Sequence, residues 1–327
     1  MLSRGEDVTA QAPMLAEETV APDEGALTAE FITFLKEVSA KRHPTGVIPR
    51  FNQGRAAGCV HAEFIVPDGL PAELRVGLFA RPGTYPARIR FANATSQSDT
   101  ERDVRGMSIK VSGVGGANLT PGVSDQDFVL NSHPVMIVGG TKEFLALLRA
   151  FEAGGARTAI FFLSRPRALA TAVASRQNAT SHLEIPYWST TPYLFGAGRA
   201  VKYIARPASP QTTPVPSPVT AGYLSERLAA HLSRQAAVFD FLVQFQTDGR
   251  KMPIEDASVE WREHDSPYRP VAQIRIPTQA LGSAAACEEM SFNPWHALTE
   301  HRPLGGFNRA RRDIYRAMAA FRGERRR

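Results

Sequence analysis

The sequence predicts an α+β fold in which an antiparallel β-barrel is surrounded by α-helices. Short runs rich in β-branched residues alternate with turn-forming residues, and this spacing is typical of an antiparallel barrel. Longer stretches with helical periodicity flank these runs. The predicted strands of this part span residues 59–66, 87–92, 107–111, 128–130 and 135–138.

The chain has 327 residues, enough for one large domain or two ordinary ones. Residues 1–26 are acidic, contain proline and carry few large apolar side chains, so we expect a disordered N-terminal arm. Residues 27–327 are expected to form a single domain. Its first helix is predicted over residues 27–41, where apolar residues repeat at helical spacing until the chain reaches His43 and Pro44.

The second half of the chain predicts further helices, a connector and two more strands. The connector is proline-rich, which favours an extended backbone. The helices are predicted over residues 141–152, 157–176 and 221–235, the connector over 205–220 and the strands over 238–246 and 269–276.

Bulk composition excludes some classes of protein. No apolar run approaches the roughly 20 residues that a membrane-spanning helix needs, so we expect no stable membrane insertion. The first residues show neither a basic segment nor an apolar segment of a secretory signal, so a cytoplasmic location is expected. Cys59 and Cys287 are the only two cysteines and lie far apart in the sequence, and we expect both to be buried, inert thiols.

The formal net charge is +6, which could indicate nucleic-acid binding. The arginines, however, are spread along the whole chain and no recognised nucleic-acid motif accompanies them. We therefore expect no nucleic-acid partner. Planar guanidinium groups can instead pair with carboxylates in a bidentate manner.

A C-terminal helix is predicted from Asn308 onward, with Arg311, Tyr315, Met318 and Arg322 on one face. A cation one turn away favours the phenolate form of the tyrosine. Tyrosinate is one of the few axial ligands that proteins give to haem iron. The same spacing also arises by accident in an arginine-rich chain, so it carries little weight alone.

The segment that contains this helix resembles the C-terminal signature of the catalase-related haem proteins, which include small peroxidase-like and allene oxide synthase-like members. It reads FNPWHAL, then HRPLGGFNRAR, then Tyr315. Four further blocks resemble the same family in the same order. They are GLFARPGTYPARIRFANA (77–94), DVRGMSIKVSGV (103–114), QDFVLNSHPVMIV (126–138) and PYWSTTPYLFGAGRAVKY (186–203).

The resemblance implies a catalase-like barrel that binds haem b. Tyr315 would be the iron ligand, with Arg311 beside it. The haem carboxylates would be held by Arg50, Arg90 and Arg322, and Phe91 would also belong to the cofactor site.

On the opposite, distal side of the haem the sequence departs from the family pattern. Gln53 stands where the family has a histidine, Ser132 where it usually has an asparagine, and Ala92 where a serine is common. Asn131 is one residue from the expected position and would need a bulge to reach the pocket. His61 lies eight residues beyond Gln53, roughly 26 Å along an extended strand, so we expect a structural or surface histidine.

The resemblance therefore implies a haem-dependent oxidoreductase that acts on peroxide or an apolar organic hydroperoxide, with catalytic positions at Gln53, Ser132, Asn131 and Arg311. Glutamine cannot titrate, so a poor catalase is expected. Two alternatives remain open: a fatty-acid hydroperoxide lyase or isomerase, and a haem-binding protein without turnover. A homo-oligomer is a further possibility.

Overall fold

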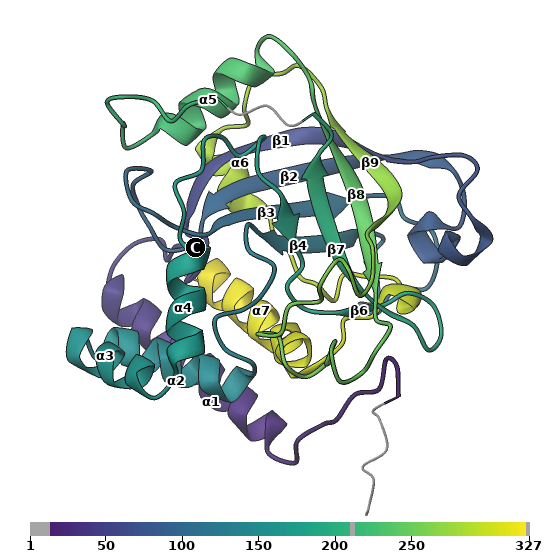
Figure 1. Ribbon diagram of the computed structural model, residues 1–327. Helices are drawn as coiled ribbons and strands as arrows, with labels where there is room; N and C mark the ends of the chain where they lie inside the picture. The colour runs from purple at the N-terminus through teal and green to yellow at the C-terminus, as the bar shows by residue number, and fades with distance from the viewer. Residues whose placement is uncertain (1–13, 210–212, 325–327) are drawn as a thin grey trace, which may run out of the picture.

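Antiparallel strands form the centre of the computed structural model, which describes residues 14–209 and 213–324. They are β1 (Arg55–Val66), β2 (Gly83–Asn93), β3 (Arg105–Val111), β4 (Gln126–Asn131), β5 (Tyr187–Trp188), β6 (Tyr193–Leu194), β7 (Ala200–Pro207), β8 (Ala237–Phe245) and β9 (Arg269–Ile276). The ring runs β5-β4-β3-β2-β1-β9-β8-β7 and closes because β5 pairs with both β4 and β7; β6 adds to β7 outside the ring (Figure 1). The predicted α+β class and antiparallel barrel are confirmed.

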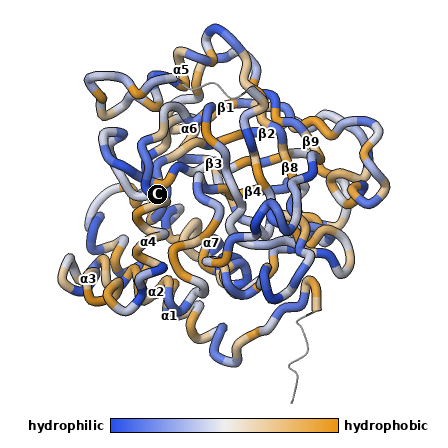
Figure 2. Tube along the Cα trace, viewed as in Figure 1, coloured by the Kyte–Doolittle hydropathy of each residue, from blue (hydrophilic) through white to orange (hydrophobic). Residues whose placement is uncertain are grey.

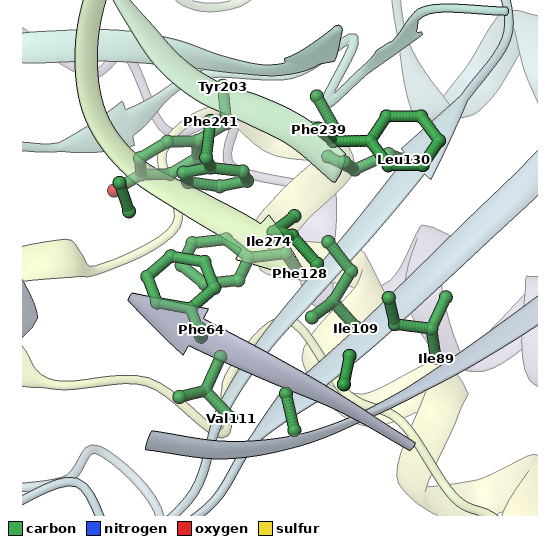
Figure 3. Close-up of a cluster of buried hydrophobic side chains, with 14 of the residues drawn as sticks. Phe64, Ile89, Ile109, Val111, Phe128, Leu130, Tyr203, Phe239, Phe241 and Ile274 are labelled. Atoms are coloured by element: carbon green, nitrogen blue, oxygen red, sulfur yellow. The ribbon is translucent and has the colours of Figure 1, made fainter. Parts of the chain in front are cut away.

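The barrel interior is filled with aromatic and aliphatic side chains (Figure 3). The rings of Phe64, Phe128 and Phe241 lie with their centroids 4.8 to 5.9 Å apart. Side chains alternate along a strand. On β2, Ile89 and Phe91 therefore join this core, while Arg90 between them faces the outside of the barrel. The packed interior leaves no room for a ligand, so a site that uses Arg90 lies outside the barrel.

The helices lie outside the barrel. Those of the described residues are α1 (Glu24–Arg42), α2 (Thr141–Glu152), α3 (Gly155–Leu163), α4 (Pro166–Ser175), α5 (Tyr223–Leu232), α6 (Ala284–Glu289) and α7 (Gly306–Glu324). Helices α1 to α4 gather with α7 at one side, while α5 and α6 lie against β1 (Figure 1). Phe31 and Leu35 of α1 pack with Leu145 of α2, and Met318 of α7 contacts the same cluster. This packing fixes α7 against the rest of the helical layer.

Two predicted elements differ from the structure. Residues 135–138 form no strand; their side chains pack into the cluster of α2 to α4, and the backbone N–H of Met136 donates to the carbonyl of Ala257. The helix predicted over residues 157–176 is broken into α3 and α4. Pro166 causes the break, because the residue before a proline is driven out of the helical region, and Arg165 has φ −138°.

The predicted connector and arm are also more ordered than expected. Residues 205–207 end strand β7 instead of beginning a connector. Residues 1–13 of the predicted arm lie outside the described residues. Residues 14–26 are held in place, because Glu18 forms ion pairs with Arg302 at 2.6 Å and with Arg309 at 2.5 Å, and α1 already begins at Glu24. This part of the arm was wrongly predicted to be disordered, because its acidic residues are partners of arginines more than 280 residues away.

The expectation of two free thiols is wrong. Cys59 on β1 and Cys287 on α6 form a disulfide across a sequence separation of 228 residues. Distance along the chain did not predict this pairing, because the barrel brings β1 and α6 into contact. The disulfide therefore ties the short helix α6 to the outside of the barrel.

Candidate functional site

Three arginines that are far apart in the sequence meet at a single carboxylate. Arg50 approaches Glu288 at 2.7 Å, Arg90 at 3.0 Å and Arg322 at 3.6 Å. Arg50 also donates to the carbonyl of Met290. We call Arg50, Arg90 and Arg322 the arginine cluster. They are the three residues that the sequence assigned to binding the carboxylates of a cofactor, and the fold does bring them together.

Arg90 is the most deeply buried member of the arginine cluster, with an exposed fraction of 1%. Burial lowers the pKa of its guanidinium, while the charge of Glu288 acts to raise it. Its Nε is buried and has no hydrogen-bond partner among the described residues. A buried guanidinium with an unused donor is suited to a further anionic oxygen.

The disulfide explains how Glu288 reaches this place. Cys59 lies directly opposite Arg90 in the register of β1 and β2, so the two side chains share one face of the barrel. Because Cys287 is bonded to Cys59, the next residue of α6 lies over Arg90. Ser283 caps α6 by accepting a hydrogen bond from the N–H of Ala286. Glu288 could not be found from the sequence, because its place at the arginines depends on how α6 is held on β1, by the disulfide and by the hydrogen bond from the N–H of Gly282 to the carbonyl of Cys59.

Gln53 and Asn131 form a second polar group on the same outer face. Nε2 of Gln53 donates to Oδ1 of Asn131 at 3.0 Å. Gly106 lies opposite Asn131 in the register of β3 and β4, and a Cβ there would come within 2.4 Å of the Gln53 amide. The absence of a side chain at residue 106 therefore makes room for Gln53. The register shows no shift at this point, so Asn131 reaches Gln53 without the bulge that we expected to be necessary.

Strand β2 connects the Gln53–Asn131 pair with the arginine cluster, because every second side chain of a strand lies on the same face. Ala92 pairs with Gly106, and Arg90 lies two residues earlier on the same face of the strand. The rise along a strand makes this step roughly 7 Å. The Gln53–Asn131 pair and the arginine cluster are thus close neighbours outside the barrel. Phe91 points the other way, into the core beside His182, and the structure does not bring it to this face.

Two other candidate residues are engaged elsewhere. Oγ of Ser132 accepts a hydrogen bond from the backbone N–H of Arg105 at 2.8 Å, so it closes the end of the β3–β4 pair. His61 is exposed on β1, as expected for a surface histidine, and its backbone N–H donates to Gln279. Of the two residues that could replace the distal asparagine, the structure therefore brings Asn131 to Gln53.

Helix α7 carries the predicted iron ligand. Tyr315 is half-buried, and its phenol makes no hydrogen bond within the described ranges of the chain. Arg311, one turn earlier, donates to Oγ1 of Thr191 at 3.1 Å and to Oδ1 of Asn308 at 3.2 Å, so it supports the loop between β5 and β6. The nearby Tyr193 is fully buried, and burial raises the pKa of its phenol to about 12, with Tyr315 adding to that effect.

The segment from residue 48 to residue 53 connects α7 with the barrel. The carbonyl of Ile48 accepts a hydrogen bond from Nε of Arg322 at 3.3 Å, and Phe51 packs into the cluster that includes Met318. Arg50 reaches Glu288, and Gln53 ends the segment over Gly106. Gln53 has φ 55°, a left-handed conformation that is uncommon outside glycine and marks a tight turn onto the barrel. One short segment therefore joins the predicted distal and carboxylate-binding residues to the tyrosine helix.

No protein-family model matches the chain, and no curated protein sequence matches it. Solved catalase structures do match. A fungal catalase has 14% identity and a TM-score of 0.70, over 95% of this chain and 66% of that one. Catalase A from Saccharomyces cerevisiae has 16% identity and a TM-score of 0.69, over 95% of this chain and 67% of that one. A bacterial catalase has 14% identity and a TM-score of 0.67, over 97% of this chain and 64% of that one. The chain spans about two thirds of their length, and the likeness shows that it has a catalase-like fold.

Proposed function

We propose that the protein is a haem-dependent oxidoreductase that acts on a peroxide or an apolar organic hydroperoxide. The observation that carries this proposal is the meeting of Arg50, Arg90 and Arg322, which lie far apart in the sequence, at one carboxylate. The catalase-like fold supports the same reading.

The residues fit a haem with two carboxylates. The arginine cluster would hold the carboxylates, and the unpartnered Nε of Arg90 is a donor still available for one of them. Tyr315 would be the axial ligand, with a phenol that is half-buried and not engaged in a hydrogen bond in the described chain. Bound haem would supply a redox-active iron that reacts with peroxide oxygen.

Gln53 and Asn131 determine what the distal side can do. An amide donates and accepts hydrogen bonds, so the pair can orient a bound peroxide. It cannot take a proton from one oxygen and return it to the other, which a general base does with a gain of about 10² to 10⁴ in rate. We therefore propose slow dismutation of hydrogen peroxide. Ser132 would act only indirectly, by fixing the end of β4 next to Asn131.

We propose an oxidising compartment instead of the cytoplasmic location expected from the sequence, because disulfides such as Cys59–Cys287 are rare in reducing cytosol and common in oxidising compartments. A homo-oligomeric state remains a proposal.

An absorption spectrum of the purified protein with added haem, followed by assays with hydrogen peroxide and with a fatty-acid hydroperoxide, tests this function. A haem spectrum with consumption of a reducing co-substrate is the expected result. Rearrangement of the hydroperoxide without a co-substrate would instead identify a lyase or isomerase. A haem spectrum with no turnover of either peroxide would identify a haem-binding protein, and no haem binding at all would overturn the proposal.

A further inference from the structure

Large apolar side chains are exposed together on α3 and α4. Leu163 is 81% exposed and Val173 is 64% exposed. Other exposed apolar residues of the same region are Phe151, Ile160 and Leu169. Figure 2 shows hydrophobic stretches of the chain in α3, at the edge of the molecule, and in the neighbouring α4. We call Ile160, Leu163, Leu169 and Val173 the apolar ridge.

The apolar ridge is a regular feature of the two helices. Its members repeat at helical spacing, with Ile160 and Leu163 on α3 and Leu169 and Val173 on α4. The opposite sides of the helices are also apolar, but there Phe161, Phe162 and Ala168 are buried against α2. Both helices are therefore apolar on two sides, and only one of these sides faces the protein.

The two helices that carry the apolar ridge contain no acidic residue of their own. Residues 153–176 contain four arginines and neither aspartate nor glutamate. Arg157 and Arg167 are exposed beside the ridge, whereas Arg165 pairs with Glu143 of α2 at 3.9 Å. Helices that lie on anionic membrane surfaces typically combine exposed apolar side chains with arginines or lysines, as α3 and α4 do.

We propose that the hairpin of α3 and α4 is a peripheral docking surface for an anionic lipid bilayer. The apolar ridge enters the boundary between headgroups and acyl chains, and Arg157 and Arg167 contact the phosphates. The helices have nine and ten residues, and among the described residues no helix is long and apolar enough to cross a membrane. The two helices therefore lie on the bilayer surface and do not cross it.

Charge argues against a second copy of the chain as the occupant. A two-fold interface places a patch against the same patch of the partner. Here that arrangement would bring arginines together in a stretch that offers no carboxylate to pair with them. An anionic bilayer satisfies both the apolar side chains and the arginines.

Flotation of the full-length protein with vesicles tests the proposal, using phosphatidylcholine alone and phosphatidylcholine mixed with phosphatidylglycerol. We expect binding to the mixed vesicles that weakens in high salt. The Leu163→Gln/Val173→Gln and Arg157→Gln/Arg167→Gln variants should each bind at least about tenfold more weakly. Val47→Gln and Arg316→Gln, exposed on other parts of the surface, are the matched controls and should bind like the unmodified protein.

Every altered side chain is exposed, so equal melting temperatures will show that the variants are folded. The proposal is overturned if the protein does not float with the mixed vesicles, or if the apolar double variant floats as well as the Val47→Gln control. It is also overturned if the protein dimerises without lipid and the Leu163→Gln/Val173→Gln variant loses the dimer but still binds the mixed vesicles. The assay needs no haem, so its failure leaves the proposed function standing.

Discussion

At the scale of single residues, the candidate site depends on which face of a strand each side chain occupies. Arg90 lies outside the barrel with Glu288, and its neighbour Phe91 lies inside with His182. Resemblance to a family assigned both to one site, but alternation along β2 allows only Arg90 to reach it. Gln53 and Asn131 illustrate the reverse, since a missing Cβ at Gly106 brings together two side chains that the sequence left apart.

Gln53, the proposed distal residue, gives the first prediction. Gln53→His should raise the rate of hydrogen peroxide dismutation by at least about tenfold, because it restores a titratable group where the amide now lies. The measurement is oxygen release at matched haem loading. Recovery should be incomplete, since Ala92 offers no hydrogen bond on this face.

His61→Ala is the matched control for this experiment. His61 is exposed on β1 and should not affect the rate. If the unmodified protein is a fast catalase that loses its activity in His61→Ala, Gln53 is not the distal residue and His61 is the general base.

The arginine cluster gives the second prediction. Arg90→Ala should weaken haem retention by roughly 3 kcal/mol, because a haem carboxylate would lose a buried partner. Transfer of haem to an excess of apomyoglobin measures the retention. Arg88→Ala, which removes an exposed arginine two residues away, should change nothing. Equal haem transfer from the Arg90→Ala and Arg88→Ala proteins would count against the assignment.

At the scale of elements, the disulfide gives the third prediction. It closes a loop of 228 residues, for which the chain-entropy model gives roughly 5 kcal/mol. Adding a reductant should therefore lower the melting temperature by several degrees. The Cys59→Ser/Cys287→Ser variant should melt at that lower temperature with or without the reductant. No change on reduction, with the thiols shown to be free, would mean that other contacts hold α6.

The sequence predicted elements well where burial follows a regular period, as in α1, α2, β9 and the long helix α7. It failed where tertiary contacts decide. Residues 135–138 have strand-forming side chains, but these side chains pack against helices, and the backbone does not pair with a strand. Residues 14–26 lack an apolar pattern, yet Glu18 and Glu24 order them by pairing with Arg309.

The same distinction applies to the candidate site. Arg90 and Tyr315 could be proposed from the sequence, because each belongs to a recognisable block, and Arg50 and Arg322 follow from the same resemblance. Glu288 could not, since its position depends on a disulfide between residues that the sequence does not pair.

At the scale of the whole molecule, buried histidines predict a loss of stability in acid. Burial lowers the pKa of His182 to about 3 and that of His301 to about 4, against an ordinary value of about 6.5. The unfolded chain therefore binds more protons below pH 6.5, and stability falls as the pH drops from there toward 4. At pH 5 each histidine should cost on the order of 2 kcal/mol.

Melting temperatures measured between pH 7 and pH 4.5 check this effect. His301→Gln should show a shallower decrease, because glutamine can still accept the hydrogen bond from the N–H of Leu78 but does not titrate. A variant with the same slope as the unmodified protein would mean that other groups cause the acid sensitivity.

The proposed function depends on haem binding beside α7, and an absorption titration of the protein with haem is its test. The unmodified protein should bind haem with a high-spin ferric spectrum. Tyr315→Phe should change that spectrum and weaken binding at least about tenfold, because it removes the proposed oxygen ligand of the iron. Tyr85→Phe, at a half-buried tyrosine on β2, should leave both unchanged. If Tyr315→Phe binds haem with the spectrum and affinity of the unmodified protein, Tyr315 is not the iron ligand and haem does not bind through α7.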